Sequence, residues 1–149
     1  MNQFDVIVVG AGHAGIEAAM ASARLGLNTL VVTTNLDRIG YMSCNPSIGG
    51  LGKGHMVREV DILGGVMGLA ADATCIQFKR LNARKGPAVR GSRAQCDKDL
   101  YCDFMINALR AQPRISLLQS EVKSLILEGG SCRGVVTEED VRLVAKAVV

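Results

Sequence analysis

The chain has 149 residues, of which 48% are hydrophobic and 21% charged, and its formal net charge is +3. This composition excludes a disordered or low-complexity chain, because the apolar fraction is high and the net charge is small. The length suits one domain or a piece of a larger one. There is no apolar run near the roughly 18 residues of a membrane span and no basic secretory leader, so we expect a soluble, cytoplasmic protein with no membrane association.

The first elements in chain order predict a βαβ unit. Residues 6–9 form an uninterrupted apolar run, which is typical of a strand buried on both faces of a parallel sheet. An alanine-rich helix is expected over 16–25, closed by Gly26, and a second strand over 29–33. A unit of this size and order is the usual frame of a dinucleotide site.

The turn between the first strand and the helix reads Gly10-Ala11-Gly12-His13-Ala14-Gly15. In such a turn the first glycine permits the tight bend, the second lets the backbone approach a pyrophosphate, and the third lets helix and strand pack closely. The helix N-terminus adds unpaired amides and a partial positive charge. We therefore predict that this turn binds a dinucleotide, the alternative being a purely structural glycine turn.

The acidic residue that normally follows the second strand and holds the ribose is missing. The sequence there is Thr33-Thr34-Asn35, and Asp37 lies past the strand in an expected turn. The Asn35 amide can still hydrogen-bond a ribose hydroxyl, although more weakly than a carboxylate.

The middle of the chain predicts a glycine-rich loop over 40–54, which we expect to pack against a flat cofactor ring. Helices are expected over 55–63, ended by two glycines, and over 92–111, stopped by Pro113.

The last third shows short runs at 115–119, 122–127 and 133–137, which suggest a small antiparallel meander before a final strand-like run over 141–149. Because no turn or cap follows that run, we expect a truncated chain, a single incomplete α/β domain over 1–149.

Five cysteines without CxxC spacing indicate neither a disulfide framework nor a metal site. They are Cys44, Cys75, Cys96, Cys102 and Cys132.

Two stretches beside the glycine turn carry a specific resemblance. Residues 43–55 read SCNPSIGGLGKGH, and residues 81–98 read LNARKGPAVRGSRAQCDK. With the turn GAGHAG, they resemble the glucose-inhibited division protein A family, which are FAD-dependent tRNA uridine 5-carboxymethylaminomethyl modification enzymes. The resemblance spans essentially the whole chain and implies the start of a Rossmann-type FAD-binding domain.

The resemblance implies that residues 10–15 bind FAD and that the main chain of Val122 contacts the adenine part. It also implies that the family does not rely on a carboxylate at the position of Asn35. It further implies NADH, a methylene-folate donor, tRNA as substrate, a GTPase partner and a homodimer. The reaction would place an aminomethyl or carboxymethylaminomethyl group on C5 of a wobble uridine. Two alternatives stay open: a non-catalytic module that binds FAD, its ADP half or only a partner protein, and an unrelated flavin oxidoreductase of the same fold.

Cys44 is the candidate catalytic residue, because a thiolate that adds to C6 of uracil makes C5 nucleophilic. Lys53 could supply the positive charge that a thiolate needs. The alternative is an inert cysteine. His13 can face the cofactor or cap the helix, and we favour the cap; His55 is read as a helix-start residue.

Seven cations and one acid lie between Lys79 and Lys98, a local charge of +6. Such a segment can hold tRNA phosphates or the FAD pyrophosphate, or be a solvated face.

Overall fold

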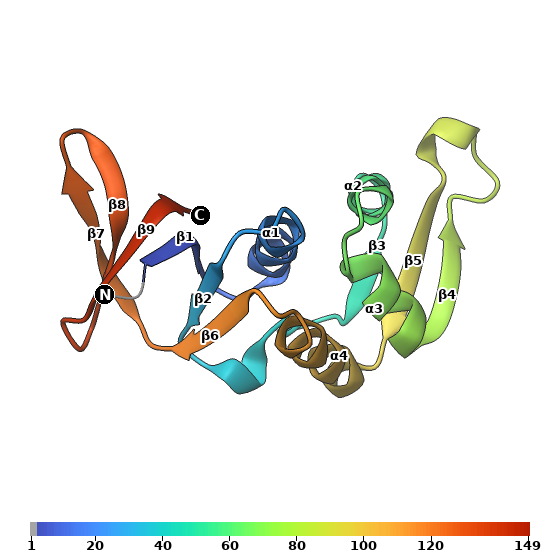
Figure 1. Cartoon of the computed structure of the whole chain (residues 1–149). Coiled ribbons are helices and arrows are strands. Elements are labelled where there is room, and N and C mark those ends of the chain that lie inside the picture. Colours follow the sequence, from blue (N-terminus) through green and yellow to red (C-terminus); the bar gives the residue numbers. More distant parts are fainter. Residues whose placement is uncertain (1–2) are drawn as a thin grey trace. The chain divides into compact units, whose positions relative to one another are not determined.

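The computed structural model describes residues 3–149, which divide into two compact units. The first unit comprises the chain up to Ile39 together with Ile106–Val149, and the second comprises Gly40–Met105. Each unit is built on its own β-sheet, as the strands of Figure 1 show. Within residues 3–149, no helix combines the length and apolar character needed to cross a membrane.

The first unit contains a six-stranded mixed sheet in the order β6-β2-β1-β9-β8-β7. Strands β6, β2, β1 and β9 run parallel, whereas β8 and β7 continue the sheet antiparallel. The α/β fold with a parallel Rossmann-type sheet is therefore confirmed. The strand bounds are β1 Gln3–Val9, β2 Thr29–Thr33, β6 Ile115–Gln119, β7 Val122–Glu128, β8 Ser131–Thr137 and β9 Arg142–Val148.

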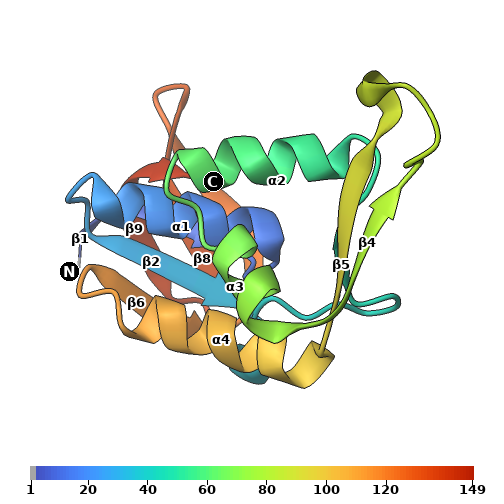
Figure 2. The ribbon, with the colours of Figure 1, turned by 90° about the vertical axis from the view of Figure 1, so that its right-hand side faces the viewer.

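The predicted βαβ unit is confirmed. Helix α1 (His13–Arg24) connects β1 to β2 and packs on β1, β2 and β6 (Figure 2). Its buried face consists of Ile16, Ala19, Met20 and Ala23, at helical spacing. The helix ends as expected, because Gly26 takes a positive φ of 85° that favours glycine.

The core of this unit lies on the sheet and explains the long apolar runs. Ile7, Leu30 and Val32 from the parallel strands form one buried cluster with Val135 and Ala145 from β8 and β9. Val6, Val8 and Val31 are buried as well, so β1 and β2 are covered on both faces. This double burial is the physical reason that their sequences lack polar alternation.

The predicted antiparallel meander is present, but the prediction of which strands form it was wrong. Residues 115–119 form β6, which pairs parallel with β2, with Leu117 opposite Val31. The antiparallel strands are instead β7, β8 and the final strand β9, which also pairs parallel with β1. A short apolar run does not reveal which neighbour it will pair with, so the local pattern could not separate the two cases.

The second unit contains a three-stranded antiparallel sheet in the order β3-β5-β4. Its strands are β3 (Ser47–Gly49), β4 (Cys75–Leu81) and β5 (Gly91–Cys96). Helices α2 (Lys53–Ile62) and α3 (Met67–Thr74) pack on its strands (Figure 2). The helix expected over 55–63 is confirmed, whereas the expected loop over 40–54 contains a short strand.

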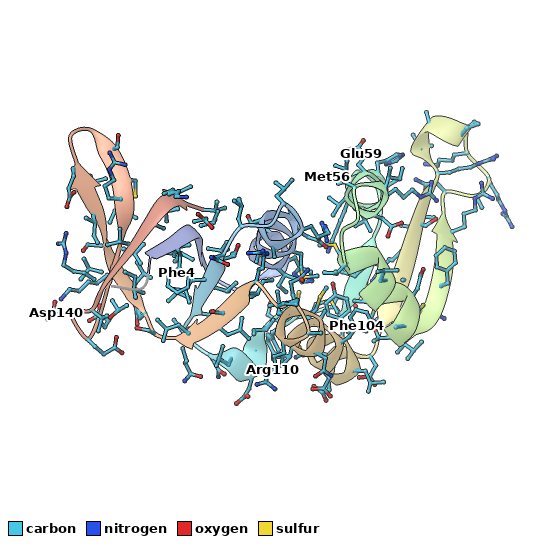
Figure 3. The ribbon with its side chains drawn as sticks, viewed as in Figure 1. Phe4, Met56, Glu59, Phe104, Arg110 and Asp140 are labelled. Carbon is cyan, nitrogen blue, oxygen red and sulfur yellow. The ribbon has the colours of Figure 1, made fainter. Side chains whose placement is uncertain are left out.

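The helix predicted over 92–111 was wrong in its first part. Residues 92–96 belong to β5, and helix α4 runs only over Lys98–Arg110 (Figure 3 labels Arg110 at its end). Ala94 pairs with Ile48 on one side and with Phe78 on the other. These two partners lie far away in the sequence, and their ladder bonds override the local helical spacing.

Acid sensitivity of the first unit is expected to depend on Asp5. Lys146 Nζ donates to Asp5 Oδ1 at 2.7 Å and the Asn28 N–H donates to Oδ2 at 2.9 Å, and both hold the pKa of Asp5 below its ordinary value. This stabilisation is complete above the unfolded-state pKa of about 4 and is lost as the pH falls through the lower folded pKa.

Asp5→Asn should therefore flatten the decline in the free energy of unfolding below about pH 4, measured by urea titration at several pH values. Lys146→Met removes the largest cause of the shift and should flatten the same window. A variant that follows the parent pH profile would contradict the role of this ion pair.

Candidate functional site

Two glycines of the turn between β1 and α1 are required by the chain's own backbone. Gly10 has a φ of 96°, and its N–H donates to Val32 O at 2.7 Å. A Cβ on Gly15 would lie 2.0 Å from Gly10 O, which no side chain tolerates. The predicted tight bend and close helix–strand packing are thus both present.

Gly12 differs from these two glycines because the chain itself does not require it. Its φ is −76°, which any residue adopts, and a Cβ there would meet no atom within 4 Å. The N-cap residue of α1 is Gly12, which makes no side-chain capping bond; His13, for which we favoured a capping role, is the first residue of the helix, and the first turn carries no acidic residue. Free space beside uncapped helix amides is the environment that suits an anionic group such as a pyrophosphate.

The remaining residues of the motif differ in burial. Ala11 is buried, His13 begins α1 and is half-buried, and Ala14 is the exposed second residue of the helix. Apart from His13, the turn therefore presents backbone and small side chains, as close approach of a ligand requires.

A pocket of about 210 Å³ lies at the carboxyl ends of β1 and β2, next to the glycine turn. The carboxyl edge of a parallel sheet is the usual ligand position in this kind of fold. The pocket brings together Gly10 and Val122, two predicted cofactor residues that are far apart in the sequence. Its lining is Val9, Gly10, Val32, Thr33, Thr34, Ser120, Glu121 and Val122.

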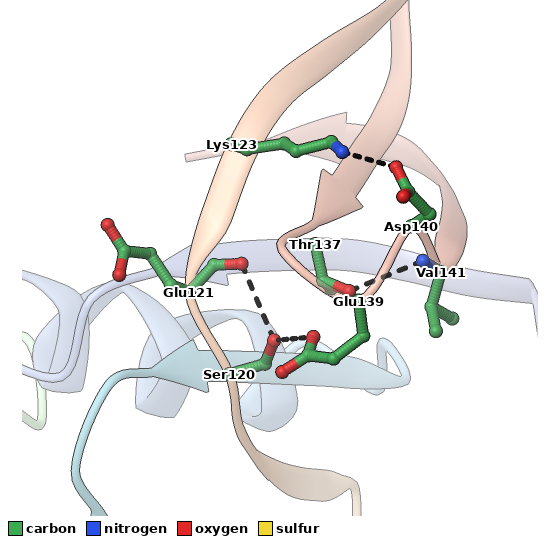
Figure 4. A network of polar contacts seen from close by, with 7 residues as sticks. All are labelled: Ser120, Glu121, Lys123, Thr137, Glu139, Asp140 and Val141. Carbon is green, nitrogen blue, oxygen red and sulfur yellow. Dashed lines mark hydrogen bonds and ion pairs between the residues drawn. The ribbon is translucent and has the colours of Figure 1, made fainter.

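Ser120 and Glu121, which line this pocket, belong to a polar network that includes Glu139 (Figure 4). Ser120 Oγ donates to Glu139 Oε2 at 2.6 Å, and the Glu138 N–H donates to Glu121 O at 2.9 Å. Hydrogen bonds from Ser120 and Thr137 hold the pKa of Glu139 below its ordinary value, so the carboxylate stays charged at neutral pH. These bonds therefore connect the turn between β8 and β9 to residues 120–121, which immediately precede β7.

Asn35 lies just beyond β2, at the start of the short 3₁₀ helix η1 (Leu36–Arg38). Its Oδ1 accepts from the Asp37 N–H at 2.8 Å, so the side chain caps η1. The Nδ2 amide group is the part that could donate to a ligand. Asp37 itself lies past β2, as predicted, but in the 3₁₀ helix η1 instead of a turn.

In the second unit, Cys44 is exposed in the segment that leads into β3. Lys53 begins α2, and its Nζ donates to Ser47 O at 3.4 Å, so the ammonium lies against the start of β3. His55 also lies in the first turn of α2, as predicted. Among residues 3–149, no group of three or more His, Cys, Asp or Glu is placed to hold a metal ion.

The glycines of this segment have a structural reason of their own. A Cβ on Gly49 would lie 2.2 Å from Ser92 O on β5, and a Cβ on Gly54 would lie 3.3 Å from the same atom. Close packing of β3 and α2 against β5 therefore accounts for two of the glycines that we associated with a cofactor ring.

One face of the second sheet carries an arginine-lined pocket of about 430 Å³. Two of its guanidinium groups are held in place: Arg58 Nη2 donates to Ser92 Oγ at 3.2 Å, and Arg90 Nε donates to Lys85 O at 3.0 Å. Phe78 adds an aromatic ring that is 64% exposed. The full lining is His55, Arg58, Phe78, Arg80, Pro87, Arg90, Gly91 and Ser92.

The basic segment predicted over 79–98 is divided between the two faces of this sheet. Arg80 and Arg90 line the arginine pocket, whereas Lys79 and Arg93 line a separate depression with Gln77 and Gln95. Lys79 and Arg93 are directly paired across β4 and β5, so they share a face. The sequence could not show this division, because it follows from strand alternation in strands that we had not predicted.

Several residues of these pockets were missed from the sequence. Arg58 lies outside any motif and reaches the arginine pocket only through α2, whereas Phe78 adjoins the basic segment in the sequence and owes its place in the pocket to β4. Ser120 and Glu121 line the pocket beside Gly10, and only their closeness to Val122 in the sequence could have suggested them.

The model of the glucose inhibited division protein A family matches residues 5–149. The chain belongs to this family. It is 68% identical over 147 residues to the tRNA uridine 5-carboxymethylaminomethyl modification enzyme MnmG of Bdellovibrio bacteriovorus, and 57% identical to that of Bacillus subtilis. Both alignments cover 99% of the chain but only 23% of the relative.

A solved structure of Aquifex aeolicus GidA superposes on the chain with a TM-score of 0.95 at 50% identity, and the match covers 99% of the chain and 24% of GidA. The chain thus spans about a quarter of the length of these family members. PqsL of Pseudomonas aeruginosa, described as a probable FAD-dependent monooxygenase, matches with a TM-score of 0.69 at 13% identity, which shows a shared fold alone.

Proposed function

We propose that the chain is the FAD-binding part of a flavoenzyme that modifies C5 of the wobble uridine in tRNA. The names of its MnmG relatives support this function. The observation that carries it is the open space at Gly12, the N-cap residue of α1: a Cβ there would meet no atom within 4 Å among residues 3–149, so packing within this part of the chain does not call for a glycine. A pyrophosphate at that place would satisfy the helix amides.

In this proposal residues 10–15 hold the FAD pyrophosphate, and Gly12 provides the space for it. The pocket beside Gly10 takes the adenosine half, with the main chain of Val122 against the adenine. Asn35 donates from Nδ2 to a ribose hydroxyl while its Oδ1 stays on Asp37. Bound FAD supplies redox chemistry, and the chain's own residues bind and orient it.

Cys44 is proposed as the nucleophile. Its thiolate would form a bond from Sγ to C6 of uracil, and the electron pair of the C5–C6 double bond would then make C5 nucleophilic. The exposed position of Cys44 leaves it accessible to a base flipped out of an RNA strand. The product would carry an aminomethyl or carboxymethylaminomethyl group on C5.

Cys44→Ser, introduced into the family-length enzyme, should leave FAD binding unchanged and reduce uridine modification at least about 1,000-fold, because a serine hydroxyl is a much weaker nucleophile. Modification is measured by nucleoside mass spectrometry of unmodified tRNA after incubation. Cys132→Ser, on β8, is the control and should retain activity. Full activity of Cys44→Ser would contradict the proposal that Cys44 is the nucleophile.

We propose that tRNA phosphates contact the arginine pocket rather than the opposite face of the second sheet. The pocket offers three arginines, two of them held by hydrogen bonds, beside an exposed phenylalanine on which a base can stack. Lys79 and Arg93 on the other face have no aromatic neighbour in their depression.

Charge reversal distinguishes the two faces. Arg80→Glu with Arg90→Glu should weaken tRNA binding and lower the slope of log affinity against log salt by about 1.5, for two lost phosphate contacts. Lys79→Glu with Arg93→Glu changes the net charge equally and should have a smaller effect. Equal effects would indicate that general charge, not this pocket, attracts the RNA; no effect of either would make the whole segment a solvated face.

The remaining parts of the proposal come from the family resemblance. NADH as reductant, a methylene-folate carbon donor, a GTPase partner, a homodimer and a cytoplasmic location complete the expected setting. These features concern the family-length enzyme, of which the chain spans about a quarter.

A further inference from the structure

Two cysteines that the proposed function does not use face each other across the second sheet. Cys75 begins β4 and Cys96 ends β5, and the strand register pairs them directly. Both are free thiols. Side chains of directly opposed residues in an antiparallel pair project from the same face of the sheet.

The backbone hydrogen bonds around Cys75 and Cys96 show which kind of antiparallel pair they form. The Cys96 N–H donates to Pro46 O at 2.7 Å, so it points away from β4. Asp97 follows Cys96 and Thr74 precedes Cys75. The Asp97 N–H donates to Thr74 O at 2.8 Å, so the hydrogen bond joins the residues next to the two cysteines. Cys75 and Cys96 therefore form a non-hydrogen-bonded pair, for which the Cα separation is typically about 4.5 Å.

This separation falls within the range of about 4.4–6.8 Å between Cα atoms that a disulfide spans. A register shift follows immediately after Cys75, so that Gln77 pairs with Gln95 and Ile76 is left as the extra residue. Bulges bend the strand and increase its local twist, and this one lies at the end of the β4–β5 ladder.

The two thiols differ in accessibility. Cys75 is partly exposed, whereas Cys96 is buried with its Sγ 3.8 Å from Ala94 O and 3.9 Å from Ala71 O. Burial raises the pKa of the Cys96 thiol, and this effect outweighs a hydrogen bond with Thr74 that lowers it. An oxidant therefore reaches Cys75 first.

We infer that Cys75 and Cys96 are an oxidisable thiol pair that closes to an intramolecular disulfide. With hydrogen peroxide as oxidant, the Cys75 thiolate attacks one oxygen, the O–O bond breaks, and Cys75 becomes a sulfenic acid. The Cys96 sulfur then attacks the Cys75 sulfur and loses its proton; the S–O bond breaks and water leaves. In total two thiols lose two hydrogens and one peroxide becomes two waters.

The disulfide would tie the beginning of β4 to the end of β5. These two points adjoin the C-terminus of α3 and the start of α4, since Thr74 ends α3 and Lys98 begins α4. The bond would close a loop that contains the whole β4–β5 hairpin and the six residues that this hairpin contributes to the arginine pocket; His55 and Arg58 of α2 lie outside the loop. Oxidation would thus stiffen the face to which we assign RNA, although the thiol chemistry itself does not depend on that assignment.

The test is peptide mapping of the purified chain after treatment with hydrogen peroxide and alkylation of the remaining thiols. We expect a Cys75–Cys96 linked peptide, a loss of about 2 Da that dithiothreitol reverses, and no such peptide in Cys75→Ser. Cys132 is an internal control, because it is also partly exposed but pairs with Leu127 instead of a cysteine.

Cys132 should become oxidised without an intramolecular partner. Separate alkylation of Cys75 and Cys96 after peroxide, or a link from Cys75 to Cys44 or Cys102 instead, would overturn the inference. The map is read on the unmutated chain, so the result does not depend on whether a variant folds. FAD and RNA binding are absent from the assay, so its failure would leave the proposed function untouched.

Discussion

Gly15→Ala is expected to lower the free energy of unfolding by about 3 kcal/mol or more. The added Cβ would lie 2.0 Å from Gly10 O and 3.4 Å from Val8 Cγ1. The first of these contacts is with backbone, which cannot rotate away, so α1 must move off β1. Urea unfolding followed by circular dichroism measures the change.

Gly12→Ala is the matched control for stability. It adds the same methyl group three residues earlier, where a Cβ meets no atom within 4 Å and the φ of −76° suits alanine. Its free energy of unfolding should differ from that of the parent by less than about 0.5 kcal/mol. Equal destabilisation by both variants would contradict the close packing at Gly15.

Gly12→Asp is expected to weaken FAD binding at least 100-fold, about 2.7 kcal/mol, without unfolding the chain. Gly12 is the N-cap of α1 in an extended conformation, which is the position that aspartate favours. The carboxylate would cap the helix amides itself, and so occupy the place of the pyrophosphate and repel its charge. FAD affinity is measured by quenching of flavin fluorescence.

Gly12→Asn separates bulk from charge, because asparagine also caps helices and has nearly the same size. It should retain more affinity than Gly12→Asp. A folded Gly12→Asp chain with the FAD affinity of the parent would contradict the proposal that the glycine turn binds the pyrophosphate of FAD.

The β1–α1–β2 unit could be predicted because its signals are local. Burial on both faces gives the continuous apolar runs 6–8 and 30–32, and backbone crowding requires Gly15. No partner from a distant segment is needed to recognise these patterns. The most specific part of the site, Gly12, belongs to the same local motif.

The second unit was harder to predict because distant partners decide it. Residues 92–96 carry helical spacing but lie between β3 and β4 as the centre of a sheet. The arginine pocket exists because α2 brings Arg58 beside Phe78 on β4. Val122 could be placed only through the family resemblance, and the structure brings it beside Gly10.

The most direct test of the proposed FAD site is a titration of the purified, flavin-free chain with FAD and, separately, with NAD. Circular dichroism with a cooperative thermal transition first establishes that the chain is folded. We predict saturable FAD binding that is tighter than NAD binding, together with a perturbed visible flavin spectrum. A folded chain that binds neither compound, or binds both equally, would contradict the assignment of the glycine turn and its pocket to FAD.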